Sequence, residues 1–145
     1  MPSIFDVARF ILNRGLPNMT HKKLQKLCYY IQAWSLAVFG RRFMDCEFEA
    51  WVHGPVCKEL YNVCKTDINA VFALQEDEFV FDQEQNEFMD LVLRLYGDRT
   101  GNELELLTHS EDPWLEARGN LKYWVTSNNV ICDDTMATYY RKELN

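Results

Sequence analysis

The 145-residue chain lacks the features of membrane and secreted proteins. Its longest apolar stretch, Leu24 to Phe39, contains polar residues and falls short of the roughly 18–20 apolar residues that cross a membrane. Residues Met1 to Asp6 contain no basic region followed by an apolar one, so we expect no secretory signal. These absences predict a cytoplasmic protein that does not bind membranes.

Glycine, cysteine and histidine are too few, or too scattered, to form the common catalytic motifs. The six glycines stand singly, which excludes a glycine-rich phosphate loop, and no Gly-x-Ser-x-Gly nucleophile motif is present. The five cysteines include no CxxC pair. Because a structural zinc site needs closely spaced ligand pairs, we expect free thiols, no metal site and no cofactor.

Basic residues are outnumbered, with 15 Lys and Arg against 22 Asp and Glu, for a net charge of −7. This balance disfavours binding to nucleic acid, which depends on cations that neutralise phosphates. The charges are also unevenly distributed. Residues 1–45 hold seven bases and two acids, whereas residues 46–145 hold eight bases and 20 acids. We therefore expect a dipolar molecule.

The residues that are present predict a mainly α, single compact multi-helix domain spanning 1–145. Apolar residues make up 48% of the chain, enough for a packed core. Capping residues and apolar periodicity predict helices that begin near residues 4, 20, 56, 82, 100, 112 and 133. Alternating residues at about 47–52, and a brief apolar run at 78–81, predict a short two-stranded β-ribbon.

The predicted helix from Thr20 to Phe39 has two different faces. One face gathers apolar residues, among them Leu24, Leu27 and Trp34, and should face the core. The opposite stripe holds Lys22, Lys26 and Tyr29, with Tyr30 beside it. One interpretation is that these lysines are simply solvated; the other is that the stripe binds an acidic partner surface.

Two polar segments offer the best candidates for chemistry. In one, His109 stands close to Glu111 and Asp112; in the other, His53 precedes Gly54 and Pro55. If the fold brought His53, His109 and Glu111 together, they could form an acid–base or metal site. Structural roles are simpler: Asp112 can cap a helix, with Pro113 in its first turn, and the Gly54–Pro55 pair can turn the chain into another helix.

Four stretches, in this order and spacing, resemble a known family. They are residues 20–34 (THKKLQKLCYY leading to Trp34), 48–61 (FEAWVHGPV leading to Leu60 and Tyr61), 107–114 (LTHSEDPW) and the closing helix from Ile131 to Tyr140. This pattern is similar to that of the Panacea domain, found in SocA-like and GepA-like phage-associated proteins. Cys28 replaces the aliphatic residue usual in the family.

The resemblance implies an antitoxin without catalysis of its own. It implies direct binding to a cognate bacterial or prophage toxin, encoded by the adjacent gene, and in a SocA-like case delivery of that toxin to a cytoplasmic AAA+ protease. No catalytic residues carry over from the family. Trp51, Trp114 and the apolar face of the 20–39 helix are then expected to hold the helices together, which leaves Lys22, Lys26 and Tyr29 to meet the partner.

Overall fold

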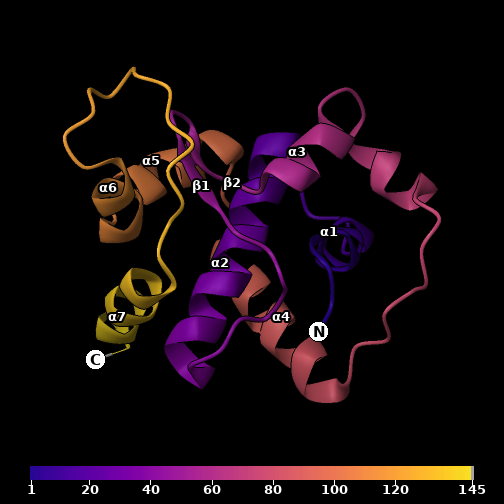
Figure 1. The fold of residues 1–145 in the computed structure, drawn as a ribbon. Coiled ribbons are helices and arrows are strands. Elements are labelled where there is room, and N and C mark those ends of the chain that lie inside the picture. The colour runs from indigo at the N-terminus through magenta and orange to yellow at the C-terminus, as the bar shows by residue number, and fades with distance from the viewer. Residues whose placement is uncertain (145) are drawn as a thin grey trace.

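The computed structural model describes residues 1–144. Within this range the chain forms seven α-helices, one 3-10 helix (η1) and two short strands, which are drawn in Figure 1. In chain order, the elements are α1 (Ile4–Asn13), α2 (His21–Phe39), β1 (Glu49–Trp51), β2 (Gly54–Val56), α3 (Lys58–Cys64), η1 (Ile68–Ala73), α4 (Gln83–Tyr96), α5 (Gly101–His109), α6 (Asp112–Arg118) and α7 (Asp133–Glu143). The expectation of a mainly helical fold with a small two-stranded sheet is confirmed.

Helix α2 passes through the centre of the molecule (Figure 1). Its first turn is capped by the Thr20 hydroxyl, which accepts a hydrogen bond from the Lys23 amide, and it ends at Gly40, whose φ of 70° is left-handed. Both ends agree with the sequence signals. Helices α1, α3, α4, α5 and α7 and strand β2 all pack against α2. It is therefore a buried helix rather than one that covers one side of a core.

Three other helices begin at capping boxes that the sequence predicts or suggests. At α1, α4 and α5 the side chain at the N-cap accepts a hydrogen bond from the backbone amide three residues later. The side chain of that later residue in turn accepts a hydrogen bond from the N-cap amide. The pairs are Ser3 with Asp6, Asp82 with Gln85, and Thr100 with Glu103. Because each cap satisfies amides that the helix leaves unbonded, these starts are encoded locally.

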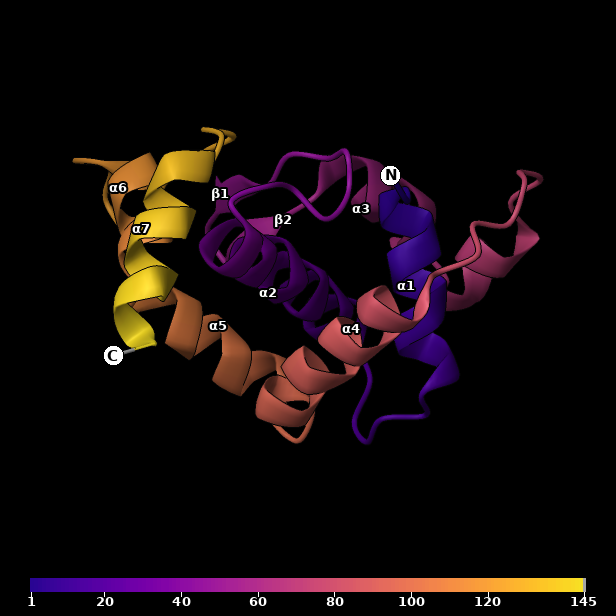
Figure 2. The same cartoon turned by 90° about the horizontal axis from the view of Figure 1, so that it is seen from below.

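The C-terminal helix α7 packs along α2. Figures 1 and 2 show it on the side of α2 opposite to α1. Tyr140 is buried in this contact, where its ring lies against those of Tyr29 and Tyr30. Chain segments more than 100 residues apart thus share one aromatic core.

The predicted ribbon is correct in its first strand and wrong in its second. Strand β1 pairs antiparallel with β2, with Glu49 opposite Val56, and segment 78–81 is not a strand. On its other side β1 meets Val130 in an isolated bridge. A hairpin closes a much shorter loop than a pairing with residues 78–81 would, which lowers the entropy cost of the contact. The third helix consequently starts at Lys58 and not beside Pro55, which lies in β2.

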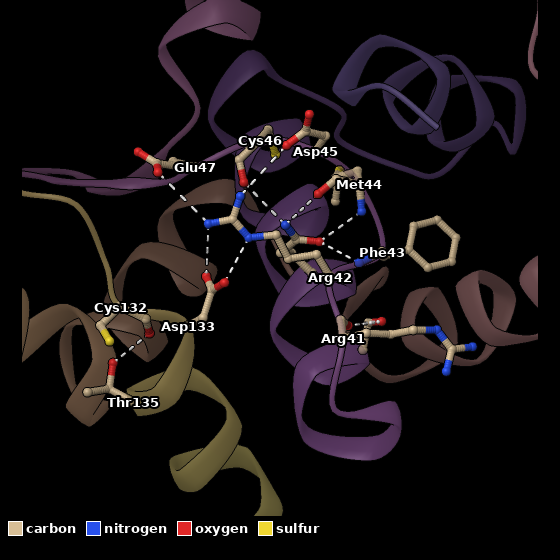
Figure 3. A network of polar contacts seen from close by, with 12 residues as sticks. Arg41, Arg42, Phe43, Met44, Asp45, Cys46, Glu47, Cys132, Asp133 and Thr135 are labelled. Atoms are coloured by element: carbon tan, nitrogen blue, oxygen red, sulfur yellow. Dashed lines mark hydrogen bonds and ion pairs between the residues drawn. The ribbon is translucent and has the colours of Figure 1, made fainter. Parts of the chain in front are cut away.

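The loop after α2 is tied to α2 and to α7, as Figure 3 shows around Arg42. The Arg42 Nε donates to Asp133 of α7 at 2.7 Å. From α2, the Gln32 amide donates to the carbonyls of Met44 and Cys46 and its oxygen accepts from two loop amides. A buried glutamine that satisfies four backbone groups explains how this loop is held without secondary structure.

Candidate functional site

Lys26, expected at the surface, lies in the core beneath the β-hairpin. Its side chain is 0% exposed, and its ammonium donates one hydrogen bond to the Pro55 carbonyl at 3.2 Å. Burial is the main cause that lowers the pKa of Lys26 to about 7, against the opposing effect of Glu105. The expectation of an exposed basic stripe is therefore wrong at this residue, because β2 and α5 cover the side of α2 that the pattern assigned to solvent.

Tyr29 and Tyr30 are likewise buried and take part in a hydrogen-bond network around Glu111. The hydroxyls of Tyr30 and Tyr140 both donate to Glu111 Oε1, at 2.7 and 2.8 Å, and Tyr29 and Tyr140 lie 3.1 Å apart at their hydroxyls. Burial raises the pKa of Glu111 to about 7, even though the two hydroxyls favour the charged form. The Tyr29 and Tyr30 side chains are thus unavailable to a partner in this structure.

Lys22 alone of the predicted stripe reaches the surface, with 31% of its side chain exposed. Its ammonium forms an ion pair with Glu105 at 2.7 Å and donates to the Asn102 side chain at 2.9 Å. His53 contacts the same Glu105 carboxylate at 3.2 Å. The lysine is consequently engaged within the chain, in a bridge between α2, α5 and the hairpin.

His109 and Trp114 fasten the hairpin to α6. The His109 ring stacks on the Trp114 indole at a centroid distance of 4.1 Å, and the indole nitrogen donates to the Trp51 carbonyl at 2.8 Å. Arg118, also buried, donates to the Ala50 carbonyl at 2.9 Å. Burial lowers the pKa of His109, so the neutral ring is favoured. The motif around His109 has a structural role here.

The expected helix cap at Asp112 is displaced by one residue. Glu111 occupies the position before the helix, Asp112 is the first helical residue and Pro113 lies in the first turn. No side chain caps this helix by a hydrogen bond. The Glu111 carboxylate instead turns inward, where hydrogen bonds from Tyr30 and Tyr140 offset part of the cost of its burial.

The three residues of the enzyme hypothesis have separate surroundings. His53 bonds to Glu105, His109 to the hydroxyl of Tyr123, and Glu111 to Tyr30 and Tyr140. Residues 1–144 include no group of three or more His, Cys, Asp or Glu side chains that could hold a metal ion. The arrangement therefore does not support an acid–base or metal centre built from His53, His109 and Glu111.

Among the surface features that sequence patterns did not locate are two open grooves. One, of about 670 Å³, lies between the hairpin residues Trp51 and His53 and the loop at Ser127. The other, of about 380 Å³, lies between α1 and the segment that follows η1. Aromatic residues make up 14% of the chain, and some of their rings remain exposed, among them Trp124 (73% exposed) and Phe72 (46%). Exposed aromatic side chains of this kind are common anchors in protein interfaces.

The two buried lysines of α2 predict opposite responses to replacement by methionine. We expect Lys26→Met to be at least as stable as the wild type at pH 6, because it removes a poorly bonded buried cation. The pKa of Lys26 is lowered from 10.5 to about 7, so the unfolded chain binds the extra proton between these values. Wild-type stability should therefore rise with pH across that window, and the advantage of methionine should shrink.

Lys23 is the matched control for this comparison. It is equally buried, but its ammonium donates to the carbonyls of Pro17 and Gly97 at 2.7 and 2.6 Å. We expect Lys23→Met to lower the free energy of unfolding by about 3 kcal/mol, since it leaves two carbonyls without donors. Urea unfolding of both variants from pH 6 to 10 measures the difference. Equal destabilisation by the two substitutions would contradict this account of Lys26.

No helix in residues 1–144 is long and apolar enough to span a membrane.

Comparison with known proteins connects these motifs to a family. No curated protein and no solved structure matches the chain. The family model described as antitoxin SocA-like, Panacea domain, matches residues 24–115, which is more than half of the chain and includes most of α2, the hairpin and the His109–Trp114 contact. The chain belongs to the SocA-like antitoxin family that carries the Panacea domain.

Proposed function

We propose that this protein is an antitoxin that neutralises a cognate toxin by binding it directly, without catalysis of its own. The observation that carries the proposal is the family match over residues 24–115. The motif residues support it chemically, because Lys26, His109 and Glu111 are occupied by contacts inside the protein. Exposed aromatic side chains provide suitable anchors for a protein partner.

We further propose that the partner is encoded by the adjacent gene and that the complex forms in the cytoplasm. Direct binding is the first step of either route to neutralisation. In the first route the bound toxin is simply blocked; in the second the antitoxin is an adaptor that hands the toxin to an AAA+ protease. Both routes require a complex, but only the second lowers the amount of toxin in the cell.

Co-expression tests the proposal and separates the two routes. We expect the product of the adjacent gene to stop growth when expressed alone, and this chain to restore growth and to co-purify with it. The same rescue in cells that lack the AAA+ proteases, with unchanged toxin levels, indicates blocking; rescue only where the proteases are present indicates delivery. Failure of this chain both to restore growth and to co-purify would refute the antitoxin proposal.

A further inference from the structure

The groove between α1 and the segment at residues 72–81 combines apolar side chains with charged and polar ones. We call it the α1 groove, and its lining includes Phe10, Phe72, Leu74, Phe79 and Phe81. The rings of Phe10 and Phe81 meet edge to face at a centroid distance of 5.7 Å. At about 380 Å³, the α1 groove has room for one or two large side chains of a partner.

Arg9 holds the α1 groove open by fixing the segment that forms its outer wall. Its guanidinium donates to the Val71 carbonyl at 2.9 Å and to the Glu76 carboxylate at 2.7 Å, and it also pairs with Asp6 on its own helix at 2.8 Å. The segment follows an extended course outside α1 in Figure 1. Since Arg9 links α1 both to η1 at Val71 and to the segment at Glu76, the α1 groove is preformed rather than created by binding.

The chain around this groove is strongly acidic. Residues 66–93 contain eight Asp and Glu and no Lys or Arg. Among the described residues, only Glu76 and Asp90 of this set form ion pairs with a Lys or Arg, namely Arg9 and Arg14. Asp77 and Glu78 lie exposed beside the groove, next to Val80, which is 86% exposed. The groove is therefore bordered by two carboxylates, those of Asp77 and Glu78, that lack a cationic partner among the described residues.

We propose that the α1 groove binds a segment of the toxin that is rich in Lys and Arg and carries an aromatic or aliphatic anchor. This inference rests on the proposed function. The aromatic part of the lining accepts the anchor, and the unpaired carboxylates attract the flanking cations and orient the segment. The same field repels phosphate groups, so nucleic acids and anionic lipids are not suitable occupants.

A basic peptide probe tests the groove independently of the toxin. The probe is a synthetic peptide that alternates Lys and Leu around a single Trp, and fluorescence reports its binding to the full chain. We expect the double variant Asp77→Lys/Glu78→Lys to bind the probe at least about tenfold more weakly than the wild type. Phe72→Ser, which removes an exposed wall but no charge, should also weaken binding several-fold, about as expected for a lost interface anchor.

The matched control places the same charge change elsewhere. Glu116 on α6 and Asp134 on α7 are exposed and lie outside the groove, so Glu116→Lys/Asp134→Lys alters the net charge equally. We expect this variant to keep probe affinity within about twofold, as is usual for distant surface charges. Equal losses of probe affinity in the two double variants would overturn the proposal, because they would indicate general electrostatic attraction to the chain and not binding in the α1 groove.

Measuring toxin binding to the wild type and to the variant distinguishes failure of the groove proposal from failure of the proposed antitoxin function. If toxin binds the wild type and the Asp77→Lys/Glu78→Lys variant equally well, the antitoxin function stands and the α1 groove is not its site. If toxin does not bind the wild type, the proposed function itself fails. A concentration-dependent dimer that the same variant abolishes would assign the groove to a second copy of the chain and also overturn the proposal. Thermal unfolding confirms that each variant is folded.

Discussion

Replacement of Gly54 by alanine is expected to lower the free energy of unfolding by about 3 kcal/mol, which corresponds to a fall of roughly 10 °C in the melting temperature. Gly54 has a φ of 108°, which L-residues rarely adopt. A Cβ at this position would also lie 2.5 Å from Lys26 Cε and 3.0 Å from Thr108 Oγ1. The substitution therefore adds backbone strain and forces the buried Lys26 side chain to move.

Gly40 is the matched control, because it has a positive φ of 70° and no atom within 4 Å of an added Cβ. We expect Gly40→Ala to cost about 1 kcal/mol, from the left-handed conformation alone. Thermal and urea unfolding of both variants measure the difference. Similar losses would show that the close approach of α2 to the hairpin contributes nothing, and would contradict the structural role assigned to the Gly54–Pro55 motif.

The second large effect concerns Glu111 and the dependence of stability on pH. Burial raises the pKa of this carboxyl from 4.5 to about 7 in the folded protein. Between these values the folded state binds the proton more readily than the unfolded chain, so its contribution to stability is full below about pH 4.5 and is lost as the pH rises to 7. A shift of this size corresponds to about 3 kcal/mol.

Glu111→Gln should remove that dependence while preserving the tyrosine contacts, because an amide oxygen accepts from both hydroxyls but does not ionise. We expect the stability of the wild type relative to this variant to fall by about 3 kcal/mol from pH 4.5 to 7. Other carboxyls, such as Asp6, are common to both proteins and cancel in the difference. Urea titrations across this range provide the measurement.

Glu116→Gln, an exposed change on the same helix, controls for the loss of one negative charge. Its stability relative to the wild type should stay constant within about 0.5 kcal/mol over the same range. A flat difference for Glu111→Gln as well would mean that the carboxyl titrates normally, and would contradict its burial among Tyr30 and Tyr140.

Local signals in the sequence predicted the helices well where a cap determines the start. Ser3, Thr20, Asp82 and Thr100 each bond to the amide three residues later, and such a contact depends only on neighbouring residues. The sequence signals predict too early a start for α3, because Pro55 suits the end of a strand as well as the first turn of a helix. The ribbon partner was misassigned because pairing depends on which turn closes, and Gly54 made the nearer hairpin available.

The predicted binding stripe of α2 is wrong for a different reason. The periodicity of α2 indicates one strongly apolar face, but it does not reveal that other helices cover the remaining sides. Lys26 and Tyr30 therefore resembled surface residues, although tertiary contacts bury them both completely. The α1 groove brings Phe10 of α1 next to residues more than 60 positions later in the chain, and no local sequence pattern predicts such a contact. Only the family resemblance, which integrates motifs across α2, the hairpin and α6, pointed to the function.

A titration of toxin activity against the purified antitoxin, with no protease and no nucleotide present, tests direct neutralisation most directly. We predict that toxin activity falls linearly and reaches its minimum at a small, fixed molar ratio of antitoxin to toxin, such as one to one, because each toxin molecule is blocked by bound antitoxin. Inactivation of a large molar excess of toxin would reveal turnover and contradict a non-catalytic role. Undiminished toxin activity at saturating antitoxin would contradict neutralisation by binding.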